Sequence, residues 1–260
     1  MIIDIDHSGR LPGCKLFKYL VSNESFTSFT IFILHFNFNF AKNVNNLWII
    51  GGGKFGLRAA KSLSQKHALN NLTIVERDKT VCRQLNRLGF EAVCTDGIQY
   101  LERNLTDAHN PDWIVPAIPL HVAYEWIRTK LSKTRSVQKI AAPDDLVSTL
   151  PHPIKAGTGQ LFISIADFNC HEDCPEPDEI CTYTGEPRLM VLHEFLNSIQ
   201  RKDIKTVVIR SHQLAPGVGG YTPRALFAAL KEIEIAQGPV SLCTACSCHG
   251  VMDVFKLSAR

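Results

Sequence analysis

From Leu47 onward, short apolar runs alternate with segments in which apolar residues recur at helical spacing. The apolar run "LWII" is followed by glycines and then by apolar positions at helical spacing in "KFGLRAAKSLSQK". The run "LTIV" comes next, and strand-like and helix-like patterns continue to alternate as far as "HVAYEWIRTKL". Such alternation predicts a parallel sheet with helices on both faces. We therefore expect an α/β fold with a Rossmann-like parallel sheet in residues 46–135.

The pattern changes after residue 135. A stretch that mixes charges, proline and glycine predicts a domain boundary between about 132 and 159. Beyond it, "QLFISIAD" and "KTVVIRS" have strand character, and "RLMVLHEFLNSIQ" has the spacing of an amphipathic helix. We predict a second, cysteine-rich α/β domain in residues 155–260. Because functional loops follow the carboxyl ends of strands in open α/β sheets, loops 170–181 and 211–220 are expected to face one crevice.

Residues 1–45 lack this alternation of strand-like and helix-like patterns. Their continuous apolar part, residues 29–36, is shorter than the roughly 20 residues of a membrane span, and no cleavage site of the A-x-A kind follows it. We expect this segment to be a disordered or artefactual extension. The same observations predict a cytoplasmic protein without a membrane span.

Glycines stand at fixed positions between the first strand and the first helix. Gly51, Gly53 and Gly56 form G-x-G-x-x-G directly after the predicted strand, an arrangement that binds the pyrophosphate of a dinucleotide at a helix N-terminus. Glu76 follows at the end of the next strand, where a carboxylate binds ribose hydroxyls. This acid favours NAD over NADP, and the neighbouring Arg77 leaves NADP open.

The stretch "WIIGGGKFGLRAAKSL", followed by "LTIVERD" and "VCTDG", resembles the NAD-binding domain of TrkA-type (RCK) proteins, the regulatory domains of potassium transport systems. The resemblance covers residues 47–118 and implies nucleotide binding at Gly51, Gly53, Gly56 and Glu76. The glycine stretch alone is also similar to the dehydrogenase part of sirohaem synthases. Neither family accounts for the cysteines, so neither the potassium-channel role nor the porphyrin chemistry is carried over.

Composition narrows the class of function. A net charge of +3, spread along the chain, gives no concentrated basic patch, so we predict no nucleic-acid partner. The chain has nine cysteines, and clustered thiols in a reducing compartment more often bind metal than form disulfides. Two groups, C-x3-C-x6-C and C-x2-C-x-C, supply the predicted metal ligands: Cys170, Cys174, Cys181, Cys243, Cys246 and Cys248.

Several alternatives remain at this stage. The metal is an iron–sulfur cluster or zinc, and six thiolates exceed the four that one such site uses. A redox disulfide, reactive thiols and ordinary buried cysteines are the alternatives to metal. His249 is a further candidate ligand and His212 a candidate acid or base. Cys82 and Cys94 are expected in the core.

The sequence thus predicts an NAD(P)-binding oxidoreductase that carries an iron–sulfur cluster. Because hydride transfer moves two electrons and a cluster accepts one, a mediator and a redox partner protein are implied. The alternative is a non-enzymatic nucleotide-sensing module of TrkA type with a structural zinc site. A zinc-dependent dehydrogenase is a third hypothesis. The sequence also leaves a homo-oligomer open.

Overall fold

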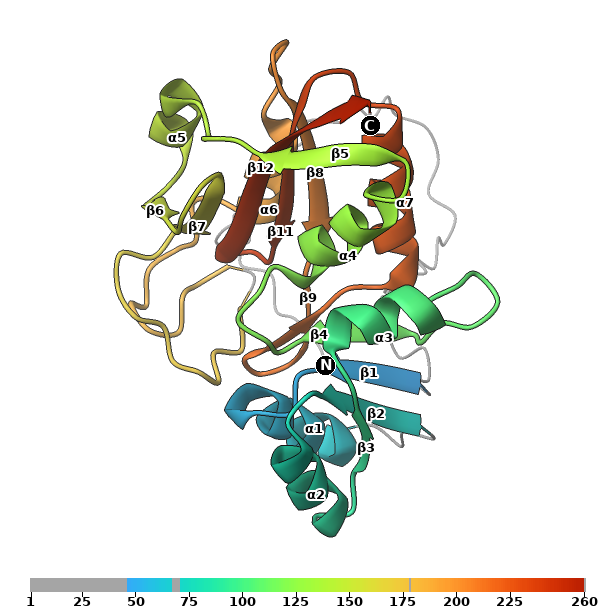
Figure 1. Ribbon diagram of the computed structural model, residues 1–260. Helices are drawn as coiled ribbons and strands as arrows, with labels where there is room; N and C mark the ends of the chain where they lie inside the picture. Colours follow the sequence, from blue (N-terminus) through green and yellow to red (C-terminus); the bar gives the residue numbers. More distant parts are fainter. Residues whose placement is uncertain (1–45, 67–70, 178, 260) are drawn as a thin grey trace, which may run out of the picture. The chain divides into compact units, whose positions relative to one another are not determined.

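We analysed a computed structural model that describes residues 46–66, 71–177 and 179–259 (Figure 1). The extension predicted for residues 1–45 lies outside the described residues. The described residues form one compact unit. Among the helices of the described residues, none combines the length and the apolar character that a membrane crossing requires.

Four parallel strands form the first sheet, in the order β3-β2-β1-β4. The strands are β1 (Asn46–Ile50), β2 (Asn71–Glu76), β3 (Glu91–Cys94) and β4 (Trp113–Pro116). Four helices follow them in turn: α1 (Lys54–Lys66), α2 (Lys79–Arg87), α3 (Gly97–Asn104) and α4 (Val122–Leu131). The predicted α/β fold with a Rossmann-like parallel sheet is confirmed.

Local chemistry fixes where two of these helices begin. The Asp78 carboxylate accepts hydrogen bonds from the backbone N–H groups of Thr80 and Val81, and so caps α2. Asp96 caps α3 in the same way through Ile98 and Gln99. Such caps pair N–H groups that the first turn of a helix cannot pair internally.

The second sheet is mixed. Its strands run in the order β6-β7-β12-β11-β8, and β5 also pairs with β12. The strands are β5 (Arg135–Lys139), β6 (Ile154–Lys155), β7 (Gln160–Ser164), β8 (Lys205–Arg210), β11 (Pro239–Ala245) and β12 (His249–Ala259). Its helices are α5 (Asp144–Thr149), α6 (Leu192–Ser198) and α7 (Pro223–Glu234). Strand β12 is antiparallel to β7 and to β11, whereas β8 and β11 are parallel, so β7, β8 and β11 all end at one edge.

The glycine-rich segment after β8 is a hairpin rather than a loop. Strands β9 (His212–Ala215) and β10 (Val218–Gly220) pair with each other, and the turn between them contains Gly217 with φ +65°. Tyr221, just beyond β10, forms an antiparallel bridge with Ile114 of β4. The hairpin therefore connects the second half of the chain with the first sheet.

Three groups of buried apolar side chains hold these elements together. One lies between the first sheet and helices α1 and α2, and includes Leu63 and Leu85. Another joins α3, α4 and α7 to strands of both sheets, and includes Trp126. The third packs α5 and α6 on the opposite face of the second sheet. Because the middle group contains residues of both sheets, they share one core.

Candidate functional site

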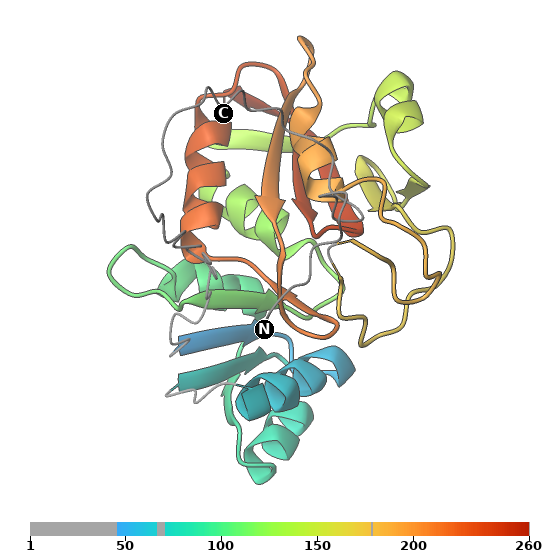
Figure 2. The same ribbon diagram turned by 180° about the vertical axis from the view of Figure 1, so that it is seen from behind.

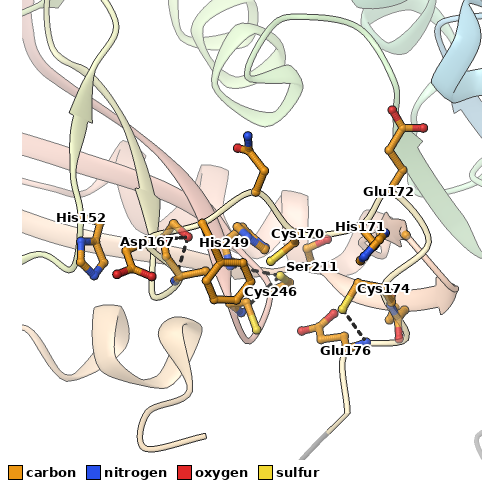
Figure 3. A pocket seen from close by; sticks show the side chains of 18 of the residues that line it. His152, Asp167, Cys170, His171, Glu172, Cys174, Glu176, Ser211, Cys246 and His249 are labelled. Atoms are coloured by element: carbon orange, nitrogen blue, oxygen red, sulfur yellow. Dashed lines mark hydrogen bonds between the residues drawn. The ribbon is translucent and has the colours of Figure 1, made fainter. Parts of the chain in front are cut away.

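A cavity of about 980 Å³ lies where the strands of the second sheet end. Ser164 is the last residue of β7, Ser211 follows β8, Cys246 follows β11 and His249 begins β12; all four line the cavity (Figure 3). The irregular segment between β7 and α6 and the β9–β10 hairpin complete the wall, and Figure 2 shows this segment from behind. The expectation that loops 170–181 and 211–220 face one crevice is therefore confirmed.

Five of the six predicted cysteine ligands belong to this region. Cys170, Cys174, Cys246 and Cys248 line the cavity. Cys181 does not line it, but its thiol interacts electrostatically with that of Cys170. Cys170 also interacts with Cys174 and with Cys248, which couples the two cysteine groups of the sequence.

The remaining cysteines lie elsewhere. Cys243 is fully buried in β11, within the apolar group that packs against α5 and α6. Cys82 is buried as expected, but Cys94 is exposed and its sulfur forms a disulfide with that of Cys82, with 6.1 Å between the Cα atoms. The expectation that both lie in the core is confirmed for Cys82 and was wrong for Cys94, because Cys94 ends β3, the edge strand of the first sheet.

Backbone N–H groups point at three of the sulfur atoms. The Cys246 sulfur accepts hydrogen bonds from Cys248 at 3.4 Å and from His249 at 3.3 Å. Cys174 accepts one from Glu176 at 3.4 Å, and Cys181 accepts two, from the second and third residues after it. These amides stabilise a sulfur that carries negative charge.

The pKa values of the thiols differ with their surroundings. Hydrogen bonds from the backbone of Thr184 and Tyr183 lower the pKa of the half-buried Cys181 thiol. Burial raises the pKa of Cys246 to about 11 and that of Cys248 to about 12, with the Glu176 charge adding to both. Burial also raises the pKa of Cys170, and the neighbouring thiols Cys174 and Cys181 add to the effect. A bound cation would offset the negative charge of these half-buried thiols and so favour the loss of their protons.

Glu176 connects the two cysteine groups. Its backbone N–H donates to the Cys174 sulfur, and its carboxylate accepts a 2.5 Å hydrogen bond from the backbone N–H of Ser247, between Cys246 and Cys248. The residue has φ +49°, a conformation that non-glycine residues rarely adopt. Within the described residues, no three His, Cys, Asp or Glu side chains are already grouped as the ligands of a single metal ion.

The three glycines of the first loop have three different surroundings. Gly51 has φ +112°, which makes the turn after β1. A Cβ on Gly56 would lie 1.9 Å from the Gly51 carbonyl oxygen, so α1 approaches this turn too closely for any side chain. A Cβ on Gly53 would meet nothing within 4 Å. The space beside Gly53 is therefore open.

Glu76 lies against the same loop. Its carboxylate accepts a hydrogen bond from the Gly52 N–H at 2.7 Å and another from the Asp78 N–H at 2.9 Å. The carboxylate is thus placed at the end of β2, beside the glycines, where the sequence predicts contact with a ribose.

Two cations of α1 reach across to the cysteine segment. Glu172, between Cys170 and Cys174, forms ion pairs with Lys54 at 2.7 Å and with Arg58 at 3.1 Å. Arg58 also donates to the Gly217 carbonyl at 3.1 Å, and the Gly217 N–H donates to the Cys174 carbonyl. The glycine loop and the cysteine segment are therefore joined through α1 and the hairpin.

The histidines divide between the cavity and its surroundings. His249 lines the cavity, as its position beside the cysteines suggested, whereas the ring of His212 packs against Trp113 at 5.3 Å. Burial lowers the pKa of both. His152 and Asp167 also line the cavity, and Figure 3 shows them at one side of it. Sequence reasoning missed both, because no motif surrounds them.

Comparison with known proteins divides the chain into two overlapping parts. A family model, AF_1314_C, described as "Uncharacterized protein, C-terminal domain", matches residues 123–258. The TrkA-N domain model matches residues 47–142, which confirms the resemblance found in the sequence and extends it beyond residue 118. A protein of Archaeoglobus fulgidus, described as uncharacterized, is 28% identical over 222 residues, which are 80% of this chain and 98% of that protein.

Proposed function

The chain belongs to the AF_1314_C family and carries a TrkA-N domain, and from the geometry of its two sites we propose that it is an NAD(H)-binding oxidoreductase with an iron–sulfur cluster held by cysteine thiolates. The observation that carries the proposal is the meeting of two distant cysteine groups at one cavity, joined by ion pairs to the helix of the glycine loop.

The surroundings of the glycines support the dinucleotide part. A pyrophosphate fits the open face of Gly53 at the N-terminus of α1, where backbone N–H groups have no partner within the helix. The Glu76 carboxylate would accept hydrogen bonds from the ribose hydroxyls in place of the one that it now accepts from the Gly52 N–H. When bound, the nicotinamide would supply a hydride or accept one.

The hydrogen bonds to sulfur support the metal part. Backbone amides aimed at Cys174, Cys181 and Cys246 would donate hydrogen bonds to the thiolates that hold a metal. Cys170 or Cys248 would provide the fourth ligand, and Cys243 is left out of the proposed set because it belongs to the apolar core. A cluster on these thiolates would exchange single electrons.

The cavity favours a redox role over a purely structural one. Structural metal sites are closed, whereas four of these cysteines line an open space of about 980 Å³. A donor, an acceptor or a redox partner protein can reach such a site. Because NADH gives two electrons at once and a cluster accepts one, a flavin on the partner would have to accept the hydride from NADH and pass its electrons singly to the cluster.

The first experiment is anaerobic purification of the full chain, followed by iron, sulfide and zinc analysis and an absorption spectrum. Iron with sulfide in near-equal amounts and a broad visible absorption are expected, together with NAD⁺ binding by calorimetry. Protein with neither iron nor sulfide, or protein that does not bind NAD⁺ or NADH, would refute the corresponding half of the proposal.

A nucleotide-sensing module with a structural zinc is the second candidate. The TrkA-N match favours it, because the domains that this sequence resembles are regulatory. Zinc in a ratio of one per chain, with no sulfide and no turnover of NADH, would establish this function in place of the first.

A further inference from the structure

Glu172 belongs to both sites at once. It lies between two proposed cysteine ligands, Cys170 and Cys174, and it lines the cavity. Its carboxylate contacts Lys54 and Arg58, the first and fifth residues of α1. Lys54 directly follows Gly53, so its ammonium group belongs to the helix end at which dinucleotide phosphates bind.

Direct packing makes this contact firm. A Cβ on Gly217 would lie 1.6 Å from the Glu172 carbonyl oxygen, so the tip of the hairpin touches the backbone of the cysteine segment. The Gln213 amide donates to the Cys174 carbonyl at 2.6 Å. Because its backbone is held in this way, Glu172 cannot move with Lys54. If the lysine turns toward another anion, its ion pair with Glu172 breaks.

We propose that Glu172 couples the two sites, so that a metal bound by the cysteine thiolates and a dinucleotide bound at the glycine loop weaken each other's binding. This inference rests on the proposed function, since it requires both ligands.

The charges of these residues make the coupling between the two ligands unfavourable. The coupling takes Cys170, rather than Cys248, as the fourth ligand. Metal ligation at Cys170 and Cys174 then fixes both ends of the short segment that carries Glu172, and so holds its carboxylate on Lys54 and Arg58. The dinucleotide phosphates need the same cations and are repelled by the same carboxylate. Each ligand therefore binds more weakly when the other is present, and by linkage the two factors must be equal.

The expected factor is moderate. Lys54 and Glu172 are more than half exposed, with relative side-chain exposures of 72% and 51%, so water and salt screen their attraction. We expect the metal to lower NAD⁺ affinity by about two- to tenfold at low ionic strength, and by less in high salt.

The test measures the NAD⁺ dissociation constant by calorimetry on the anaerobically purified full chain, before and after a chelator removes its metal. Glu172→Gln removes the charge and keeps the shape of the side chain. Lys54→Met removes the same ion pair from the helix and leaves the cysteine segment intact. Glu172→Gln should bind NAD⁺ equally with and without metal. Lys54→Met should bind NAD⁺ more weakly in both states and should show a smaller difference between them than the native chain, because the ion pair of Arg58 with Glu172 remains.

The matched control is Asp173→Asn. Asp173 is the next residue of the same segment, and none of the ion pairs found among the described residues involves it. This control should keep the full two- to tenfold difference. The proposal is overturned if the native chain binds NAD⁺ equally in both states or more tightly with metal, or if Glu172→Gln keeps the native difference. Absence of either ligand from the protein would instead refute the proposed function and, with it, this coupling.

Discussion

The His121 ring and the Asp253 carboxylate meet in the core at 2.8 Å, although 132 residues separate them in the sequence. His121 precedes α4 and Asp253 lies in β12, and both are buried. The other ring nitrogen of His121 lies 2.8 Å from the Thr244 hydroxyl, and Lys139 forms an ion pair with Asp253. A buried polar network therefore joins the end of the first sheet to the second.

Removing the charge of Asp253 should destabilise the fold. Asp253→Asn leaves the Lys139 ammonium without its counter-charge and weakens the hydrogen bond to His121, so we expect a loss of about 3 kcal/mol in the free energy of unfolding. Denaturant titration measures this loss. Asp144→Asn removes an exposed ion pair with Lys155 and should change stability by less than about 0.5 kcal/mol; a loss of similar size in both variants would contradict the prediction.

The same network predicts a pH dependence. Burial alone would raise the pKa of Asp253, but His121 and Lys139 together outweigh it and hold the pKa below its ordinary value. A carboxyl with a lowered folded-state pKa adds stability that is present above its unfolded pKa of about 3.9 and is lost as the pH falls through the folded value. The stability difference between native protein and Asp253→Asn should therefore shrink below about pH 4. A constant difference from pH 6 to pH 3 would show that Asp253 does not titrate in this way.

Two alanine substitutions should separate the packing role from the binding role of the glycines. Gly53→Ala places its methyl group in open space, so the fold should keep its stability within about 0.5 kcal/mol while NAD⁺ affinity falls by about tenfold. Gly56→Ala forces α1 away from the Gly51 carbonyl and should cost about 1–3 kcal/mol. Thermal unfolding and calorimetry on both variants measure the two effects. Unchanged NAD⁺ binding by Gly53→Ala would place the phosphates elsewhere.

Glu76 should set the choice of cofactor. Glu76→Ala removes the carboxylate that would accept the ribose hydroxyls, and we expect about a tenfold loss of NAD⁺ affinity. NADP⁺ binding should fall less or improve, because the repulsion of its 2′-phosphate is removed. Equal losses for both cofactors would indicate that Glu76 only supports the loop through Gly52 and Asp78.

Two cysteine substitutions should separate an effect on stability from an effect on metal content. Cys243→Ala removes a fully buried sulfur and should cost about 1–2 kcal/mol of stability with no loss of metal. Cys181→Ser changes a half-buried residue outside the apolar core to one of similar size, so it should leave the stability of the metal-free protein nearly unchanged and lower the metal content. Metal analysis and denaturant titration distinguish these results; loss of metal from Cys243→Ala would return that residue to the ligand set.

Periodicity predicted the first sheet well because each of its strands is followed at once by a helix. The glycine spacing located the turn after β1, because the close packing of α1 against this turn requires glycine at position 56. The hairpin after β8 was missed because "SHQLAPGVGG" is too rich in glycine to show strand alternation. Cys243 was grouped with Cys246 and Cys248 by spacing alone, although alternation along β11 turns its side chain into the core.

The pairing of Glu172 with Lys54, the position of Glu176 and the contribution of His152 to the cavity could not be predicted. Each depends on contacts between segments that are distant in the sequence, and no local pattern of charge or hydropathy indicates which segments come into contact. The stretch near residue 135 combines both cases. The strand character of "VQKIAA" indicated β5, whereas its pairing with β12 depends on a segment more than 100 residues away.

That strand has a consequence for how the gene can be divided. A fragment that ends at residue 142 would carry β5 away from β12, and one that begins at residue 155 would lack both that strand and the partners of Asp253. Each piece would expose apolar faces of the shared core and tend to aggregate. These two fragments should therefore regain solubility only when β5 is kept with β12, that is, when the chain is not divided between residues 142 and 155.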